Sequence, residues 1–337
     1  MSRIMSPPVR CTFFLAGEDL ESLSRIDPDR DWRELQTGER AWILQTWLRL
    51  RCAGHPVELS GTAPEDGLVV FHAKQARELL RQRSRLRGAT LVAARADNRQ
   101  PLIADFEVLQ NGFFADSRRR FFVPHWPQPG LVPRDPARGE RVERIAFKGF
   151  AANLHPAFRT AAWADFLAEE GIEWVVDAVA FAGGNRLELE WPDFRQVDLV
   201  LAVRPDERKM RRSKPSTKLF NAWLAGVPAL LGPELAFREL RRSELDYLEV
   251  ASVAEARAAV LRLRRDPGLY RAMVENGARR GAEFTAAALV PRWADLLFET
   301  IPALAEERRA RLVRRLPLPA RAAGRWIART VTLRPAR

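Results

Sequence analysis

The sequence predicts an α/β protein made of two parallel-sheet domains joined by a linker. Short apolar runs rich in β-branched residues alternate with helical patterns in both halves, which is typical of parallel sheets covered by helices. The 337 residues suffice for two such domains. Residues 125–140, HWPQPGLVPRDPARGE, are rich in proline and glycine and lack periodicity, as linkers do. We therefore expect domains at 1–124 and 141–300, with the linker at 125–140 and a basic tail at 301–337.

The first half begins with a strand, CTFFLA, at residues 11–16. A helix is expected at 40–52, because its apolar residues form one stripe and Gly54 follows its end. A second, very basic helix is expected at 74–87. Further strands are expected at 56–60, 68–72 and 90–94, a short helix and strand at 103–110, and an exit from the domain at 121–124.

The second half begins with RIAFKG at 144–149, a strand that enters a loop at 150–155. Pro156 fits the first position of a helix that runs to about Glu170. Later strands are expected at 173–177, 198–203, 229–232 and 247–251, and later helices at 253–264, 268–284 and 289–299.

Composition excludes several classes of protein. A hydrophobic content of 47% with 29% charged residues is typical of a soluble globular protein. No run reaches the ~18 apolar residues of a membrane-spanning helix, and the apolar run near the N-terminus is too short for a secretory signal. Cys11 and Cys52 are the only cysteines, which excludes a disulfide scaffold and a structural zinc site. We therefore expect the protein in the reducing cytoplasm.

The formal charge of +12 is concentrated in the tail. Residues 302–337 hold ten arginines and two glutamates, a net charge of +8, so the remaining 301 residues carry only +4. The body shows no pattern of basic and aromatic residues typical of nucleic-acid recognition. We therefore expect no nucleic-acid partner.

The segment 198–232 combines apolar strands with a cationic loop and helix start. After the strand at 198–203 come Arg204, Lys214 and Lys218, and Gly226 suits the left-handed position that closes the helix. In open α/β sheets, ligands bind beyond the carboxyl ends of strands, beside helix N-termini that favour anions. Local chemistry therefore indicates an anion site, although a solvated basic face would show the same pattern.

The run KPSTKLFNAWLAGVPALLGPELAFREL, from Lys214 to Leu240, resembles the donor-binding segment of GT-B glycosyltransferases related to families 1 and 4. The first half resembles GT-B N-terminal domains more weakly. Residues 289–299 resemble the helix that crosses back onto that domain. The resemblance implies a GT-B architecture, with two Rossmann-like domains facing a cleft and a nucleotide-sugar donor bound mainly by the second.

The resemblance also implies a set of donor-binding residues. Where the family has two glutamates eight residues apart, this chain has Ser213 and Asn221. Asn221 is left to contact the ribose as an amide, and Glu239 is a candidate for the missing carboxylate. The full set implied for the donor, mainly its diphosphate and ribose, is Gly149, Asn153, Arg204, Lys214, Lys218, Asn221 and Glu239.

Three residues are candidates for acid–base chemistry. His72 ends a strand as a histidine does in the family, Asp97 follows the next strand, and Asp193 lies in the WPDF loop. Each also has an ordinary structural explanation, as a strand-end or turn residue. Asp27-Pro28-Asp29 matches a D-x-D metal motif, but its polar, proline-containing context indicates a turn. We therefore predict neither a metal nor a cofactor, and a nucleotide sugar as co-substrate.

The predicted function is transfer of a sugar from a nucleotide donor to a hydroxyl of a glycan, a lipid-linked glycan or a small molecule. An epimerase of the same architecture and a catalytically silent glycan- or anion-binding module remain alternatives. The tail mixes arginines with Trp326 and Ile327, which suits peripheral contact with an anionic membrane. Pro317 and Pro319 are expected to break any helix there.

Overall fold

A computed structural model describes residues 10–86, 88–179, 190–205, 214–307 and 316–332. Ser213, one of the two positions where the family has glutamate, lies outside them. Contacts divide the chain into two compact units. The first comprises Met1–Pro28, Glu34–Val123 and Val290–Arg337, and the second comprises Asp29–Arg33 and Pro124–Leu289. The linker thus packs with the second unit, and the segment after Leu289 packs with the first.

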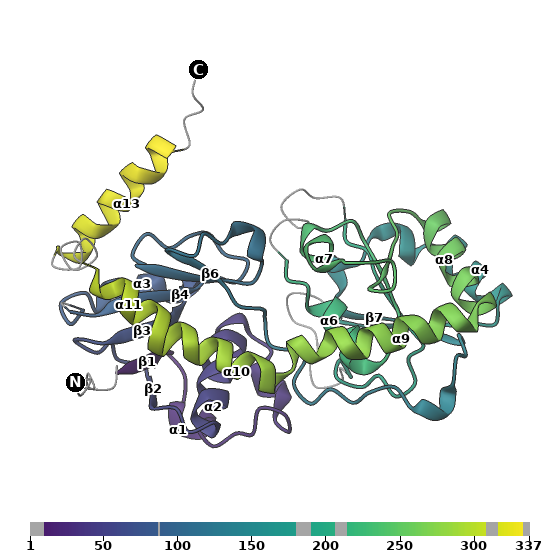
Figure 1. Cartoon of the computed structure of the whole chain (residues 1–337), viewed down its shortest axis with the longest axis horizontal. Coiled ribbons are helices and arrows are strands. Elements are labelled where there is room, and N and C mark those ends of the chain that lie inside the picture. Colours follow the sequence, from purple (N-terminus) through teal and green to yellow (C-terminus); the bar gives the residue numbers. More distant parts are fainter. Residues whose placement is uncertain (1–9, 87, 180–189, 206–213, 308–315, 333–337) are drawn as a thin grey trace, which may run out of the picture. The chain divides into compact units, whose positions relative to one another are not determined.

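The first unit contains a six-stranded parallel sheet of order β2-β1-β3-β4-β5-β6 (Figure 1). Strand β1 pairs with β2 on one side and β3 on the other, so Cys11 lies between Val57 and Leu68. Residues of β1, β3, β4 and β5 are buried throughout, because helices cover the sheet. The strands are β1 (Cys11–Phe14), β2 (Val57–Ser60), β3 (Leu68–His72), β4 (Thr90–Ala94), β5 (Phe106–Leu109) and β6 (Arg120–Phe122).

Two expected helices of the first unit differ from the structure: the short helix expected near residue 103 is a turn before β5, and the helix at 74–87 is shorter. The expected helix at 74–87 is a 3-10 turn (Ala73–Gln75) followed by α3 (Ala76–Arg81). The last long helical segment returns to this unit, where the Trp293 ring meets Trp42 edge-on at 6.3 Å and Phe298 stacks on His55 at 5.4 Å. Remaining helices are α1 (Leu20–Leu23), η1 (Trp32–Leu35, shared with the second unit), η2 (Arg40–Leu44), α2 (Gln45–Cys52), η4 (Gly112–Phe114), α10 (Ala286–Ala294, which crosses from the second unit), η10 (Asp295–Thr300) and α11 (Ile301–Glu306).

The second unit contains a five-stranded parallel sheet of order β11-β10-β9-β7-β8. Strand β7 lies between β9 and β8, so the chain order reverses at β7. Apolar residues of the sheet and its helices form one large core that includes Phe147, Leu201 and Trp223. The strands are β7 (Arg144–Phe150), β8 (Glu173–Val179), β9 (Leu199–Ala202), β10 (Ala229–Leu231) and β11 (Leu248–Glu249).

Helix boundaries in the second unit follow local chemistry. Gly226 has a φ of 68° and closes α6 (Thr217–Ala225), as predicted. The helix expected from Pro156 to Glu170 is interrupted, because Thr160 is extended between a 3-10 turn (Pro156–Arg159) and α4 (Ala161–Glu169). The other helical segments are η5 (Pro136–Arg138), η6 (Ala151–Asn153), α7 (Leu235–Leu240), α8 (Val253–Arg265), α9 (Pro267–Gly281) and η9 (Ala282–Phe284).

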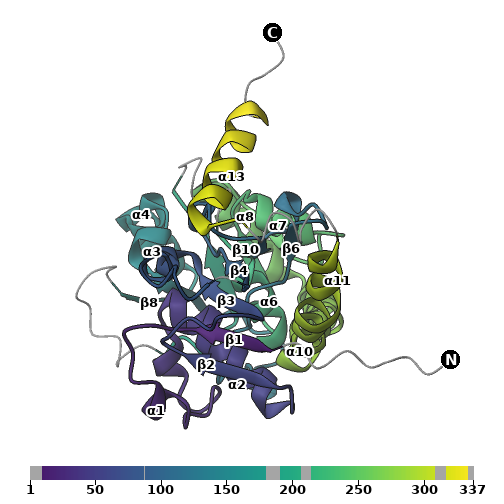
Figure 2. The same ribbon diagram turned by 90° about the vertical axis from the view of Figure 1, so that its left-hand side faces the viewer.

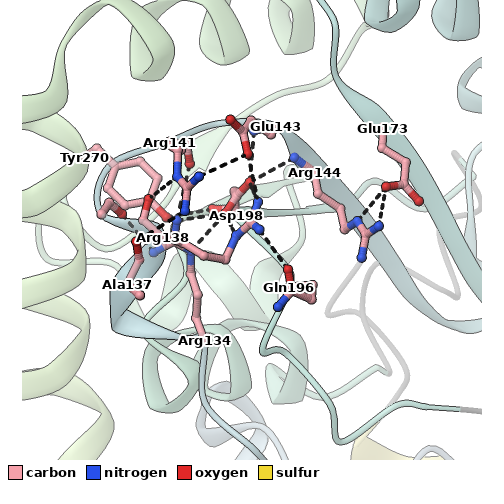
Figure 3. Close-up of polar contacts among 11 residues, drawn as sticks. Arg134, Ala137, Arg138, Arg141, Glu143, Arg144, Glu173, Gln196, Asp198 and Tyr270 are labelled. Carbon is pink, nitrogen blue, oxygen red and sulfur yellow. Dashed lines mark hydrogen bonds and ion pairs between the residues drawn. The ribbon is translucent and has the colours of Figure 1, made fainter.

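A buried carboxylate fastens the linker to the second unit (Figure 3). Asp198 is fully buried just before β9 and accepts paired hydrogen bonds from Arg134 (3.0 and 2.7 Å) and from Arg138 (2.7 and 2.7 Å). The amides of Glu143 and Arg144 each donate to it at 2.9 Å. Burial alone would raise the pKa of Asp198, but these hydrogen bonds outweigh burial and hold its pKa below the usual range.

Beyond α11, the described residues of the tail include helix α13 (Leu318–Thr332). The expectation that Pro317 and Pro319 break a helix here was wrong. Both prolines lie at its start, where the first amides need no intrahelical partner and a fixed φ suits the first turn. Leu318 is buried in the first unit's core. Within the described residues, no helix is long and apolar enough to cross a bilayer.

Candidate functional site

The reversal of strand order at β7 places its carboxyl end beside that of β9. In open parallel sheets this switch point is where ligands bind, because loops diverge there and helix N-termini approach. Phe150 ends β7, and Arg204 lies two residues beyond β9. The loop after β7 is joined to the end of β9 by the His155 amide, which donates to the Val203 carbonyl at 2.8 Å. The loop after β7 and the end of β9 therefore lie next to each other at this edge.

Lys218, in the first turn of α6, lies at the centre of this edge. Its amine donates a hydrogen bond to the Lys148 carbonyl and lies 4.6 Å from the centre of the Phe147 ring. The pKa of Lys218 is lowered to about 7, mainly by burial and also by the positive charges of Arg204 and Lys148, while Asp177 opposes this shift. Within the described residues, no carboxylate pairs with this amine. The site therefore favours an anion that would restore its charge.

Lys148 and Asp177 form a second charged pair on the adjacent strands β7 and β8. The Lys148 amine lies 3.1 Å from the Asp177 carboxylate and donates to the Glu190 carbonyl at 2.8 Å. Both side chains are 11% exposed. This pairing holds the Lys148 amine beside Lys218, so the edge presents two lysine side chains.

Arg204 supplies a third cation, and Glu234 balances it. The Arg204 guanidinium is buried, forms an ion pair with Glu234, and lies 5.7 Å from the centre of the Phe237 ring. Glu234 follows β10 immediately before α7 and is also buried. The buried pair fixes the guanidinium at the end of β9, next to Lys218.

Gly149 leaves the space that Lys218 fills. Its φ of 147° is a conformation that residues with side chains rarely adopt. A Cβ there would lie 2.7 Å from the Lys218 amine. The structure thus brings together Gly149, Lys218 and Arg204, three of the residues that the resemblance implied for the donor.

The other implied donor residues occupy more varied positions. Lys214 is half-buried but precedes α6 because Pro215 keeps it out of the helix, so its spacing from Lys218 is not a helical one. Asn153 ends the 3-10 turn after β7. Asn221 accepts a hydrogen bond from the Gln128 amide at 3.0 Å, which ties α6 to the linker. Glu239 is exposed on α7.

The first unit has its own switch point, where β1 pairs with both β2 and β3. Gln75 joins the two strand ends there, since its amide side chain bonds both the amide and the carbonyl of Ala16. His72 ends β3 and is 1% exposed, and its Nδ1 accepts from the Lys74 amide at 3.4 Å. A carboxylate oxygen of Glu39 lies 3.9 Å from the same nitrogen.

Burial lowers the pKa of His72 to about 4, with Lys74 lowering it and Glu39 and Asp97 raising it. The ring is therefore neutral at pH 7. Because Nδ1 accepts a hydrogen bond, Nε2 carries the proton. This Nε2 is buried and has no protein partner, and a Cβ on Gly38 would lie 3.3 Å from it. His72 thus presents a hydrogen-bond donor.

The two aspartates proposed for acid–base chemistry differ in their surroundings. Asp97 is exposed in the turn after β4, near enough to His72 to affect its pKa. Asp193 accepts hydrogen bonds from Arg195, the shortest at 2.6 Å. The hydrogen bond from Arg195 lowers the pKa of Asp193. The Asp193 carboxylate therefore stabilises the loop in which it lies.

Sequence reasoning missed Lys148, Asp177, Glu234 and Glu39. Lys148 is the one charged residue inside the run RIAFKG apart from its first residue, and it lies at the carboxyl end of the strand. Glu234 follows the Gly-Pro pair after β10. A systematic survey of charged residues at predicted strand ends would have found both. The same survey would have found Asp177, which ends the strand expected at 173–177, whereas Glu39 carries no comparable signal.

Neither a cavity elsewhere in the second unit nor a cluster of metal ligands offers a better candidate for the functional site. A cavity of ≈ 530 Å³ lies near the amino end of β9, but its buried cation, Arg134, is already paired with Asp198. Among the residues that the structure describes, no group of three or more His, Cys, Asp or Glu could hold a metal ion. Asp29, from the D-x-D motif, lies in a turn and accepts from the Gly130 amide at 3.3 Å.

Known protein structures match this fold, whereas no model of a protein family and no curated protein matches the sequence. The crystal structure of Anabaena HepE in complex with UDP and glucose superposes with a TM-score of 0.53 at 13% identity, covering 86% of this chain and 99% of HepE. Sucrose-phosphate synthase from Thermosynechococcus elongatus gives 0.52 at 12% identity, covering 79% and 94%. An α1,3-fucosyltransferase gives 0.50 at 9% identity, covering 88% and 92%. The chain therefore has the GT-B fold, with two parallel-sheet units of six and five strands.

Proposed function

We propose that this protein is a glycosyltransferase that transfers a sugar from a nucleotide donor to an acceptor hydroxyl. The observation that carries the proposal is the cluster of Lys148, Arg204 and Lys218 at the switch point of the second unit. Its central amine has no carboxylate partner among the described residues. A diphosphate supplies the negative charge that this cluster lacks. Another crystal structure shows HepE, a structural neighbour, in complex with UDP-glucose.

The three cations stabilise the diphosphate as it leaves, which is the task a metal ion performs in many transferases. We propose on this basis that the reaction needs no metal. Amides of the loop after β7, from Gly149 to Asn153, are suited to phosphate oxygens. Lys214 adds a cation from the loop before α6. Asn221 and Glu239 remain proposed ribose contacts, whereas Glu234 is already paired with Arg204.

His72, Asp97 and Asp193 remain proposed catalytic residues, with different roles. Neutral His72 donates a hydrogen bond from Nε2. Asp97 is the preferred base, because it follows β4 in the first unit near His72 and is exposed to solvent. The acceptor is a hydroxyl of a glycan, a lipid-linked glycan or a small molecule.

The test replaces the two lysines that flank the start of α6. Lys218→Ala and Lys214→Ala should each lower turnover about 10²-fold, as loss of one electrostatic stabiliser typically does. Calorimetry measures the binding of UDP and GDP, and the release of nucleoside diphosphate from sugar donors measures turnover. Arg279→Ala, an exposed cation on α9, is the matched control and should leave both unchanged. Wild-type binding and turnover in both lysine variants would contradict the assignment.

A catalytically silent module that binds an anionic glycan is the second candidate. It is favoured by Asn221, which replaces a family glutamate and has its side-chain oxygen engaged by the Gln128 amide. Binding of an anionic glycan without binding of UDP or GDP would support this candidate over the first.

A further inference from the structure

Helix α13 packs on the first unit through a stripe of two apolar and two basic side chains. Leu318, Arg321, Ala322 and Arg325 lie three or four residues apart, which places them on one face of the helix. Leu318 is buried among residues of the sheet and α3, and Ala322 packs against the same cluster. The helix is therefore held by its N-terminal half.

Two arginines of α13 face the protein. Arg321 and Arg325 each form an ion pair with Asp105, one with each carboxylate oxygen. Arg325 also donates to the Leu102 carbonyl at 2.9 Å. Asp105 further accepts from the Leu91 amide at 2.9 Å, so the pair is anchored to β4. These two cations are thus paired with the protein.

As far as Ile327, where the described side chains of α13 end, the part of the helix turned away from this stripe is apolar and exposed. Trp326 and Ile327 are 57% and 56% exposed, the largest exposed fractions among the exposed large apolar side chains of the described chain. Their exposed neighbours on the helix, Ala320, Ala323 and Gly324, carry no charge. Figures 1 and 2 both show α13 extending from the first unit. A surface helix usually has the reverse arrangement, with charges outward and apolar residues inward.

We propose that the exposed face of α13, centred on Trp326 and Ile327, binds an anionic lipid surface. The choice of occupant rests on charge. Residues 302–337 carry a net charge of +8, and after Glu307 the chain has no acidic residue. An interfacial helix combines apolar insertion, often through tryptophan, with attraction of basic residues to anionic headgroups. The ion pairs with Asp105 hold the helix so that the apolar face points away from the protein.

The experiment is flotation of the full-length protein with phosphatidylcholine vesicles, with and without phosphatidylglycerol. The wild type should bind only the anionic vesicles and should dissociate as salt increases. Trp326→Ser/Ile327→Ser should lower the partition coefficient about 10²-fold, because two apolar side chains lose their insertion. Phe113→Ser, which removes another exposed aromatic residue of the same unit, is the matched control and should bind as the wild type does.

Three outcomes would overturn the proposal. They are equal flotation of the double variant and the wild type, equal binding to neutral vesicles, and absence of binding by the wild type. Light scattering tests a second copy as the occupant, and a wild-type dimer that the double variant dissociates would also overturn it. UDP calorimetry on the double variant separates this proposal from the proposed function, because α13 contributes no residue to the second unit.

Discussion

At the residue scale, Lys218 shows how a buried cation becomes a binding group. Burial and two neighbouring cations make its charged form costly, while Asp177, bound to Lys148, offsets only part of this cost. A bound diphosphate would reverse the balance by placing negative charge beside all three cations. Binding and protonation at Lys218 are then coupled.

This coupling predicts a pH dependence of nucleotide affinity. Lys218 loses its proton near pH 7 in the free protein, and a bound diphosphate raises its pKa. Affinity for UDP should therefore fall by up to about tenfold per pH unit above pH 7, with proton uptake on binding. Calorimetry in buffers of different ionisation enthalpy measures this uptake. Lys218→Met should bind more weakly and without the uptake, and an unchanged pH profile in this variant would exclude Lys218 as the group.

Gly149 gives a second prediction at this scale. Gly149→Ala introduces a methyl group where the Lys218 amine lies and forces a side chain onto an unfavourable φ. We expect a loss of about 1–3 kcal/mol in the free energy of unfolding, as for other strained backbone positions. UDP affinity should fall as well. Gly139→Ala, at another glycine of positive φ with nothing near its Cβ, should affect stability but not affinity. Unchanged UDP binding in Gly149→Ala would contradict the close approach.

At the element scale, the linker is held against the second unit by hydrogen bonds and ion pairs. The turn at Pro136–Arg138 and the start of β7 converge on Asp198 through two arginines and two amides. The Val132 amide also bonds the Pro192 carbonyl, and Phe194 bonds Val132 in return. These contacts explain why the linker packs with the second unit although it contains no strand.

Removal of this carboxylate should destabilise the second unit strongly. Asp198→Asn leaves two largely buried guanidinium groups without a counter-charge, which typically costs about 3–5 kcal/mol. Urea unfolding, followed by tryptophan fluorescence, measures the change in the free energy of unfolding. Glu140→Gln, which breaks an exposed pair with Arg271 in the same linker, should have a much smaller effect, because solvent screens this pair. Equal effects of the two substitutions would argue against a special role for Asp198.

At the scale of the whole molecule, the two units carry different chemistry. The cationic cluster belongs to the second unit, whereas His72, Asp97 and the exposed face of α13 belong to the first. A nucleotide held by the second unit should stabilise that unit by mass action.

Hydrogen exchange should locate this stabilisation. With UDP present, we expect the strongest protection at 147–154 and in the first turn of α6, because those amides border the cationic cluster. Protection should disappear in Lys218→Ala. Protection confined to the first unit would place the nucleotide elsewhere and contradict the assignment of the donor site.

Local patterns in the sequence predicted most of the regular structure. The limits of β3 and β4 were predicted to the residue, and α6 ends at Gly226 as expected. These features depend on nearest neighbours, namely apolar runs, caps and a left-handed glycine. The breaks at Thr160 and Arg81 were not predicted, and neither was the helix that starts at Pro317–Pro319, because a proline pattern alone does not distinguish a helix start from a helix end.

The sequence by itself determined that the chain forms two parallel sheets, with a basic strand–loop–helix segment in the second. Only the tertiary structure decided which charges meet. Lys148 lies 70 residues before Lys218 but shares its hydrogen bond, and Arg321 lies 216 residues after Asp105 but neutralises it. Such encounters depend on strand order and on the path of the returning chain, which no short-range pattern encodes. The same reason explains why Arg321 and Arg325 of α13 face inward while Trp326 is exposed.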